Sequence, residues 1–498
     1  MEKVEWHDVQ GLVLSGYPQL PFSAYVPWRL REGEGAAART WLRSLAGQLM
    51  RAGPNDTDDD TPTDGAEDGR AGPHIRRLKG GGGEVVREAV NIAFTASGLR
   101  AFCGTGGIAP FSLEFVEGMA PARDGAGRPS RRTNVLGDLG QSSPANWEWG
   151  GWGGNDAIDG LLMLFAPDAT GLEALLARQL AAMAPVAVPL VAPDSGGPLV
   201  LPGRVFDDRT EHFGYRDGIS QPIIEGSPKA HRHRDDAEAR RVHFVKPGEF
   251  LFGYRNERRV RSGTDDLRRN GSYLVLRQLE QDVAAFSDFV ARAAAALPDD
   301  EPDASKREWI AARLVGRCPD GRPLAAPADG TTAGDSEAAP EQDNDFLYYY
   351  NDRFGLRCPI GAHIRRANPR DTKGPDPDTA LQLSKMHRLI RRGRMYGERF
   401  DPARPEDGGR RGILFMAFNA DIAGQFEMIQ HSWLNSRHFG DLHVGTDPIG
   451  HFADDDDAVV IQNRPVNIVV PRPKPFVRVR GGAYFFLPGI DAVRRLAG

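Results

Sequence analysis

The sequence has few cysteines, and their spacing suggests neither a disulfide framework nor a metal clip. Only three occur among 498 residues, Cys103, Cys318 and Cys358, and they stand far apart without a CxxC pair. An odd number of widely separated cysteines is typical of a protein that folds in a reducing compartment. We therefore expect a cytoplasmic protein.

Long apolar runs are also missing. No stretch approaches the ~20 apolar residues that a membrane span requires. The opening segment, MEKVEWHDVQGLVLSGYPQL, has no apolar region behind a basic start and no paired arginines. The sequence therefore predicts no export signal and no membrane partner.

The sequence also lacks an excess of one charge. Its 62 Lys and Arg and 68 Asp and Glu give a net charge of −6, and basic residues alternate with acidic ones through the loops. A protein that binds nucleic-acid phosphates is expected to concentrate basic residues in a groove or stripe. We therefore expect no nucleic-acid partner.

The length and composition indicate a folded protein with more than one domain. The chain is 40% hydrophobic and 26% charged, which is typical of globular proteins. Its 498 residues exceed what one ordinary core supports. Two domains with long surface insertions are the natural expectation.

One pattern occurs four times: a short apolar run, a polar turn and an amphipathic helix. The copies begin at Val90, Leu161, Ser272 and Ile413. Apolar residues recur at helical spacing in the second copy (Leu172, Leu175, Leu176, Leu180, Met183) and in the fourth (Ile422, Phe426, Ile429, Trp433). Aspartates stand where each of three helices should begin, at Asp168, Asp282 and Asp421.

A strand followed by a helix that packs back across it, twice per half, is what a ferredoxin-like β-α-β-β-α-β unit contains. We therefore predict an α+β protein of two tandem ferredoxin-like halves with antiparallel sheets, residues 1–205 and 206–498. A strand following Val205 and the final run from Phe476 should add to the sheets.

The first polar segment of interest is EHFGYRDGISQPIIEG, from Glu211 to Gly226. Gly214 and Gly218 bracket Asp217, so the segment should form a tight turn with one carboxylate at its tip. Taken alone, the segment is better explained by an aspartate that only satisfies its own backbone.

The second segment is RCPIGAHIRRANPRD, in which His363 precedes three arginines, Arg365, Arg366 and Arg370. A charged histidine would be repelled by these cations. A neutral imidazole bound to iron suits the position, and the arginines could pair with two haem propionates. The alternative is a basic surface loop with an ordinary histidine.

The third segment is HRLIRRGRMYGERF, where Arg391 and Arg392 precede Gly393. Adjacent side chains of an extended segment point in opposite directions, so only one of the two guanidinium groups can face a pocket. The pattern alone does not choose between them.

Taken together, GYRDG, GAHIRRANPR and LIRRGRMYG resemble the signature set of the dye-decolourising haem peroxidases. The resemblance to the longer bacterial members extends over nearly the whole chain, including WEWGGWGGNDAIDGLLMLFA and FMAFNADIAGQFEMIQHSWLN. It implies two ferredoxin-like halves, with haem b held in a pocket of the C-terminal half.

The resemblance also implies roles for individual residues. Asp217 corresponds to the distal acid-base residue, His363 to the proximal ligand of the iron, and Arg391 to the distal arginine, with Arg392 as the fallback. The family usually places an acid behind the proximal histidine, for which Asp421 and Glu427 are both candidates.

The implied function is a peroxidase that reduces hydrogen peroxide to water while it oxidises dyes, phenols or other aromatic donors. The alternative is a haem-handling protein that stores haem, delivers it or removes its iron. Such a protein would use the same residues. A haem-thiolate protein using Cys358 or Cys318 is a further one. The resemblance is also compatible with a homo-oligomer.

Overall fold

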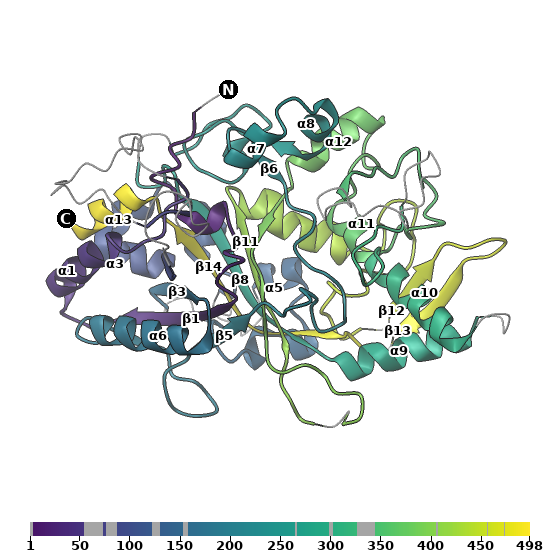
Figure 1. Ribbon diagram of the computed structural model, residues 1–498, viewed down its shortest axis with the longest axis horizontal. Coiled ribbons are helices and arrows are strands. Elements are labelled where there is room, and N and C mark those ends of the chain that lie inside the picture. Colours follow the sequence, from purple (N-terminus) through teal and green to yellow (C-terminus); the bar gives the residue numbers. More distant parts are fainter. Residues whose placement is uncertain are drawn as a thin grey trace.

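An antiparallel sheet closes on itself at the centre of the protein (Figure 1). The computed structural model describes residues 3–53, 73–75, 87–121, 130–152, 158–263, 266–297, 302–325, 344–404, 407–455, 457–472 and 474–498. The strand order is β10-β5-β1-β3-β2-β14-β8-β11-β9, and β10 also pairs with β11. Because β10 pairs on both sides, the strands form a ring.

The ring consists of two groups of strands. The first group contains β1 (Phe22–Leu30), β2 (Ala89–Phe94), β3 (Gly160–Ala166), β5 (Leu201–Arg204) and, beside β1, β4 (Ala187–Pro189). The second contains β8 (Ser272–Gln281), β9 (Ile390–Arg391), β10 (Arg394–Tyr396), β11 (Gly412–Asn419) and β14 (Val477–Leu487).

Each group has the strand order of a ferredoxin-like unit, in which the fourth strand lies beside the first and the third beside the second. This order is β5-β1-β3-β2 in the first group and β14-β8-β11-β10 in the second. The predicted α+β class with antiparallel ferredoxin-like halves is therefore confirmed. The division into domains at residues 205 and 206 stays a prediction.

The groups meet at two narrow seams. Phe94 of β2 pairs with Phe486 of β14, and Arg204 of β5 pairs with Met395 of β10. Pairing within a group is longer, since β14 pairs with β8 along the whole of β8, with one register shift between Val479 and Gly481. The two groups therefore interact mainly through side chains on the faces of the sheet.

The structure corrects two details of the predicted strands. The strand expected after Val205 is wrong, because β5 ends at Arg204 and residues 205–222 contain no strand. The first repeat, from Val90, is not the first strand-helix unit of its half, because β1 and α1 (Gly35–Ala46) precede it. The expected final strand from Phe476 is confirmed as β14.

Helices cover the outer side of the ring (Figure 1). The longer ones are α3 (Ala96–Ile108), α6 (Ala169–Met183), α9 (Val283–Ala295), α10 (Asp303–Val315), α12 (Pro377–Lys385) and α13 (Ile490–Ala497). The shorter ones include α4 (Leu113–Glu117), α5 (Arg131–Leu136), α7 (Pro228–Arg232), α8 (Ala237–His243) and α11 (His363–Ala367). Two consecutive π-helical segments, η7 (Ile422–Glu427) and η8 (Ile429–Leu434), follow β11.

The three predicted helix starts are confirmed by their capping bonds. Asp168 accepts a hydrogen bond from the Gly171 amide, Asp282 from the Ala285 amide, and Asp421 from the Gly424 amide. Each carboxylate satisfies an amide that has no partner within the helix. These side chains therefore define where α6, α9 and η7 begin.

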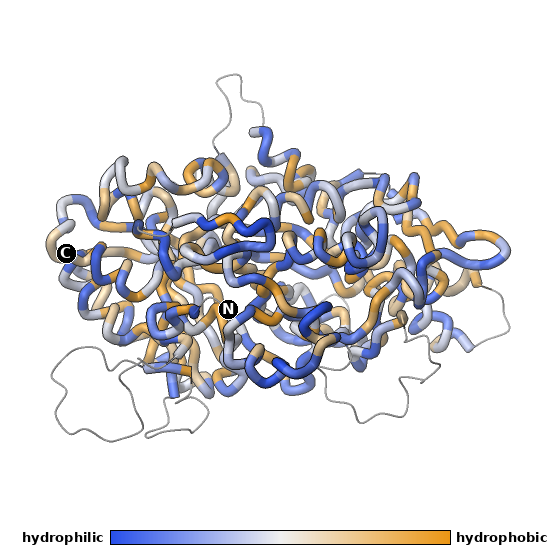
Figure 2. The backbone as a smooth tube through the Cα atoms, turned by 90° about the horizontal axis from the view of Figure 1, so that it is seen from above, coloured by the Kyte–Doolittle hydropathy of each residue, from blue (hydrophilic) through white to orange (hydrophobic). Residues whose placement is uncertain are grey.

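Both faces of the ring are buried, because successive side chains of a strand point to opposite sides. Leu162 and Leu164 of β3 belong to the apolar cluster on the helix side, whereas Leu161 and Met163 belong to the cluster on the other side. That second cluster also includes an N-terminal stretch with Val9, Leu12, Val13, Tyr17 and Leu20. Figure 2 accordingly shows apolar and polar colours alternating over short distances along the tube.

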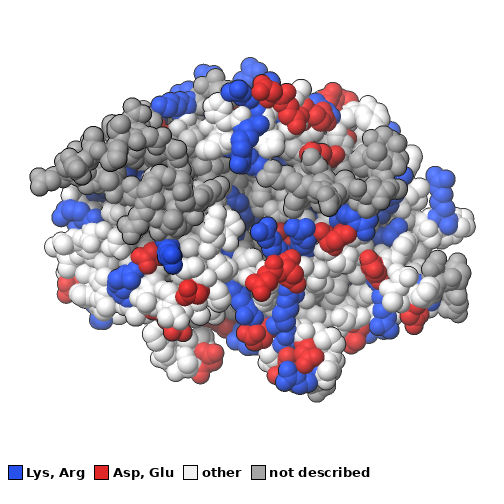
Figure 3. All heavy atoms as spheres, in the orientation of Figure 1, with Lys and Arg blue, Asp and Glu red and all other residues white. Residues whose placement is uncertain are grey.

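At the periphery, a hairpin of β12 (Asp457–Ile461) and β13 (Ile468–Arg472) lies near α9 and α10 (Figure 1). Two short parallel strands, β6 (Ile223–Ile224) and β7 (Phe244–Val245), pair beside α7. Basic and acidic side chains are interspersed on the face drawn in Figure 3. Within the described part of the chain, no helix is both long and apolar enough to traverse a bilayer.

Candidate active site

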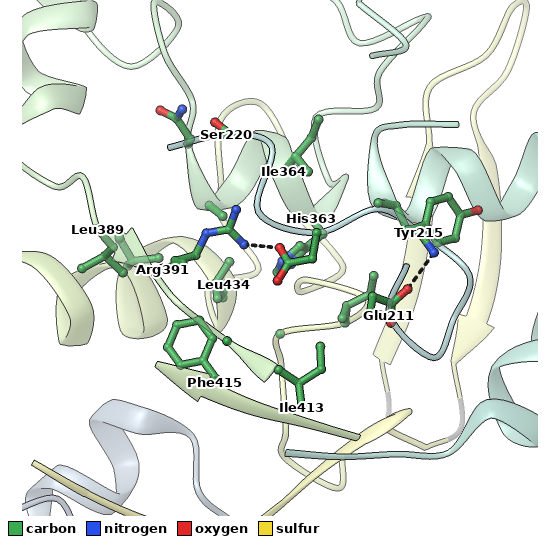
Figure 4. A pocket seen from close by; sticks show the side chains of 18 of the residues that line it. Glu211, Tyr215, Ser220, His363, Ile364, Leu389, Arg391, Ile413, Phe415 and Leu434 are labelled. Carbon is green, nitrogen blue, oxygen red and sulfur yellow. Dashed lines mark hydrogen bonds and ion pairs between the residues drawn. The ribbon is translucent and has the colours of Figure 1, made fainter. Parts of the chain in front are cut away.

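A cavity lies on the helix side of the second strand group, where β8 and β11 face α11, η7 and η8. Its apolar lining includes Leu279 of β8, Ile413 and Phe415 of β11, and Leu434 of η8. The last three are labelled in Figure 4. The cavity encloses about 1820 Å³ of space free of protein atoms, part of it continuous with solvent. The surface of the cavity is thus mostly apolar, and charged side chains line it at several points.

Asp217 lies at the tip of a turn on the wall of this cavity, as predicted. Gly214 (φ 92°) and Gly218 (φ 78°) have positive φ, a conformation that other residues adopt at a cost. An Asp217 carboxylate oxygen accepts a hydrogen bond of 2.8 Å from the Arg391 guanidinium, the dashed line at Arg391 in Figure 4. The segment therefore presents one ion-paired carboxylate to the cavity.

The ion pair determines the charge of Asp217. Burial alone would raise the pKa of this carboxyl, but the Arg391 guanidinium and the Gly218 amide outweigh burial, and the pKa lies below its usual value. Asp217 is therefore ionised at neutral pH and can accept a proton from a molecule in the cavity.

Two side chains that the sequence reasoning missed hold this pair in place. Glu211 accepts hydrogen bonds from the amides of Phe213 and Tyr215, which fixes the start of the turn. Gln221 bonds both backbone groups of Arg391, accepting from its amide at 3.0 Å and donating to its carbonyl at 3.1 Å. The turn that carries Asp217 is thereby tied to β9, which carries Arg391.

His363 lines the cavity at the first position of α11. Its Nδ1 lies 3.0 and 3.1 Å from the two oxygens of Asp447, so this nitrogen carries the proton and donates. The side chain is 31% exposed, which is consistent with a ring that faces the cavity. Nε2 is therefore the nitrogen left to bind a ligand.

Asp447 corrects the expectation for the acid behind this histidine. Asp421 caps η7, and Glu427 binds Arg132 at 2.8 Å and Tyr484 at 2.9 Å, so neither candidate contacts His363. Asp447 is fully buried, and His363, Arg366 and the Gly450 amide hold its pKa below the usual value despite burial. It is therefore a carboxylate.

The sequence carried only a weak signal for this partner. Asp447 precedes Pro448 and accepts bonds from the amides of Ile449 and Gly450, the pattern of an aspartate in a turn. Many aspartates in this chain have such surroundings. Asp447 is 84 residues from His363 in the sequence, so only the folded structure shows that the two are in contact.

The structure distinguishes Arg391 from Arg392. Arg391 lines the cavity, whereas Arg392 donates to the carbonyls of Leu12 at 3.0 Å and Val13 at 2.8 Å. The two side chains point to opposite sides of an extended segment, as expected. Arg392 thus binds the N-terminal stretch and has no place in the cavity wall.

The three arginines after His363 do not all face the cavity as expected. Arg365 donates to the carbonyls of Asp352, Arg353 and Cys358, and Arg366 to those of Trp433, Ser436 and Gly445. Both are buried in these contacts and neither lines the cavity, which corrects the expectation for them. Arg370 does line it, while donating to the carbonyls of Asn344 and Phe346.

The cysteines do not contribute a ligand to this site. Cys358 is buried, its pKa is raised to about 12 by burial, and neither it nor Cys318 lines the cavity. Among the residues that the structure describes, no group of three or more His, Cys, Asp or Glu side chains could hold a metal ion. The thiolate alternative therefore has no support in the geometry.

Comparison with known proteins gives the same family from sequence and from structure. No family model matches the chain. The multifunctional dye peroxidase of Amycolatopsis sp. is 31% identical over 494 residues, which cover 93% of this chain and 90% of that protein. A dye-decolorizing peroxidase of Exidia glandulosa is 28% identical over 81% of this chain and 75% of its own length.

Solved structures agree. The structure of an ancestral D-type dye-decolorizing peroxidase superposes with a TM-score of 0.74 at 25% identity and covers 99% of both chains. A peroxidase of this type from Anabaena sp. has a TM-score of 0.72 at 22% identity, over 99% of this chain and 94% of its own. The chain therefore belongs to the dye-decolorizing peroxidases and is an oxidoreductase that acts on peroxide.

Proposed function

We propose that the cavity binds haem b, that His363 Nε2 is the protein ligand of the iron, and that Asp217 and Arg391 carry out the acid-base chemistry. The observation that supports this most directly is that His363, whose Nε2 has no hydrogen-bond partner among the described residues, and a carboxylate-guanidinium pair line the same apolar cavity. A macrocycle needs such an apolar space with a nitrogen donor in its wall.

The residues present suit haem on chemical grounds. The Asp447 carboxylate accepts a hydrogen bond from the Nδ1–H of His363, which fixes the tautomer and makes Nε2 a stronger donor. Apolar side chains such as Leu279, Ile413 and Phe415 supply the surface against which a porphyrin would lie. When bound, haem would supply the electrons that reduce peroxide and would later recover them from a donor.

Asp217 would move the proton that this reaction requires. Its carboxylate would remove a proton from one oxygen of the peroxide, and the protonated form would return it to the other oxygen, which leaves as water. One oxygen of Asp217 is bonded to Arg391, and the lone pairs that remain on the carboxylate can accept a proton. The same residue thus acts first as a base and then as an acid.

Arg391 would contribute in two ways. Its positive charge favours the ionised form of Asp217, whose pKa lies below its usual value. It also stabilises the negative charge that develops on oxygen as the O–O bond breaks. Each turnover would consume hydrogen peroxide and two electrons from dyes, phenols or other aromatic donors.

The free cysteines support a reducing compartment, and on that basis we place the protein in the cytoplasm. The names of the similar proteins support dyes as electron donors for this chain as well.

The test is the absorbance spectrum of purified His363→Ala protein beside wild type. We expect the wild type to show an intense Soret band and the variant to lose it, because the iron loses its ligand. His438→Ala, which removes an exposed histidine, serves as the control and should retain the band. A Soret band of normal intensity in His363→Ala would remove the ligand assignment.

The same preparations separate a peroxidase from a protein that strips or delivers haem. A peroxidase oxidises a reporter dye over many turnovers when peroxide is added, without releasing free porphyrin. Porphyrin release without sustained dye oxidation would favour the haem-handling alternative.

A further inference from the structure

The arginines in the cavity wall differ in whether their guanidinium groups have a hydrogen-bond acceptor in the protein. Six arginines line the cavity: Arg216, Arg277, Arg317, Arg370, Arg388 and Arg391. Five of them donate to protein acceptors, namely Asp320, Asp138, Gly321, Asn344 with Phe346, and Asp217 respectively. Within the described ranges, the guanidinium of Arg388 alone has no such acceptor.

Arg388 is nevertheless held in place and largely shielded from solvent. Its carbonyl accepts a 2.7 Å hydrogen bond from the Gln425 side chain, and only 9% of the residue is exposed. Burial, together with the neighbouring charges of Arg370 and Arg391, lowers its pKa to about 9. A buried cation without a counterion is destabilising, so an anion at this position would be strongly favoured.

The chain does not supply that anion from the described cavity wall. Its two acidic residues are Glu211 and Asp217. Glu211 accepts bonds from two backbone amides and from Gln281 at 2.6 Å, and Asp217 is paired with Arg391. Neither carboxylate of the described wall is therefore left to pair with Arg388.

We propose that Arg388 binds a carboxylate of the ligand that fills the cavity, and that this carboxylate is a propionate of the haem. The inference rests on the proposed function and adds a residue that holds the haem. The planar guanidinium can donate two parallel hydrogen bonds to a carboxylate, which fixes the direction of the propionate as well as its charge. Arg370 adds positive charge to the same region of the wall.

The test measures haem loss, which does not depend on turnover. Apoprotein is reconstituted with ferric protoporphyrin IX or with its dimethyl ester, whose propionates carry no charge. The rate of transfer to excess apomyoglobin is followed in the Soret region. We expect Arg388→Leu to lose protoporphyrin on the order of tenfold faster than wild type, and Arg388→Lys to lie between them.

With the dimethyl ester, wild type and Arg388→Leu should lose the haem at the same rate. Arg216→Leu, which removes a cavity arginine that already has an acceptor, should leave the loss of protoporphyrin unchanged. If Arg388→Leu does not fold, the rates of haem loss are compared with Arg388→Gln instead.

Three results would overturn the proposal. Unchanged loss of protoporphyrin would show that Arg388 does not hold it, and equal acceleration with both haems would show a purely structural role. A raised KM for an anionic dye but not for a neutral phenol, with unchanged haem loss, would assign the carboxylate or sulfonate to the electron donor. A wild-type apoprotein that takes up neither haem would instead refute the proposed function.

Discussion

Asp217 and Arg391 illustrate how one residue sets the protonation state of another. The carboxylate is placed where burial favours its neutral acid, and the adjacent guanidinium reverses that preference. The balance is local, so changing one of the two residues alters the chemistry of the other without affecting the fold.

We predict that Arg391→Leu retains haem but loses peroxidase activity by roughly two to three orders of magnitude, because the developing charge on oxygen is no longer stabilised. The acid limb of the pH profile should also move. In wild type the pKa of Asp217 lies below its usual 3.8, so activity falls only when the pH falls through that lowered value. Without Arg391, burial raises this pKa and the limb shifts to higher pH.

The measurement is kcat/KM for peroxide as a function of pH. Arg216→Leu should leave the acid limb in place, since this residue has no bond to Asp217. An Arg391→Leu profile with an unshifted limb would mean that Asp217 is not the group that titrates.

At this scale the sequence identified the residues that occur in contiguous motifs. Asp217, His363 and Arg391 were predicted and now lie around one cavity. Asp447 could not be predicted, because its partner is 84 residues away and its own surroundings are those of an ordinary turn. Arg365 and Arg366 were expected to face the cavity and do not, because buried carbonyl groups take up their guanidinium donors.

At the scale of elements, the site depends on the link between the Asp217 turn and β9. Gln221 makes this link with two hydrogen bonds to the backbone of Arg391. A side-chain amide that bonds both the amide and the carbonyl of one residue acts like a neighbouring strand, and it fixes the relative position of the two segments.

We predict that Gln221→Leu lowers kcat about tenfold, because a small displacement of the turn weakens the Asp217–Arg391 geometry. The Soret band and the melting temperature should change little, since the cavity and the core remain. Steady-state kinetics and thermal melts of the same preparation measure both. Ser220→Ala, at the adjacent cavity residue, is the control. A fall in melting temperature that matches the fall in kcat would indicate a general structural role.

Elements with strong local signals were predictable, and those that depend on tertiary contacts were not. The capping aspartates and the apolar periodicity located α6, α9 and the helix after β11. The π-helical winding of η7 and η8 cannot be predicted from the spacing of apolar residues in the sequence. Strands as short as β9 and β10 depend on pairing with their neighbours, which are β11 for β9 and both β11 and β5 for β10.

At the scale of the whole molecule, the two strand groups share apolar clusters although their backbones meet only at narrow seams. Phe94 lies at one seam and is fully buried. Its ring packs against those of Trp28 and Phe102, with ring centroids 5.9 and 5.7 Å apart respectively. Because both faces of the ring are covered by continuous clusters, we expect the halves to unfold together.

We predict that Phe94→Ala lowers the free energy of unfolding by about 3–5 kcal/mol, the usual cost of removing a buried phenylalanine ring. In denaturant titrations, the Soret band and far-UV circular dichroism should lose signal at the same midpoint, and the variant should shift both equally. Phe94→Leu should have a smaller effect. If only the circular dichroism shifted while haem stayed bound, residues 1–205 and 206–498 would be independent domains.

The closed ring also affects how copies of the protein meet in a crowded solution. An unpaired strand edge is a template for the addition of strands from other molecules, and proteins keep such edges short or covered. Within the described residues of the main sheet, the outermost strands are the two-residue β9 and the three-residue β4. Fibril growth should therefore begin elsewhere, and the five-residue strands of the β12–β13 hairpin, with Val469 exposed, are the more vulnerable place.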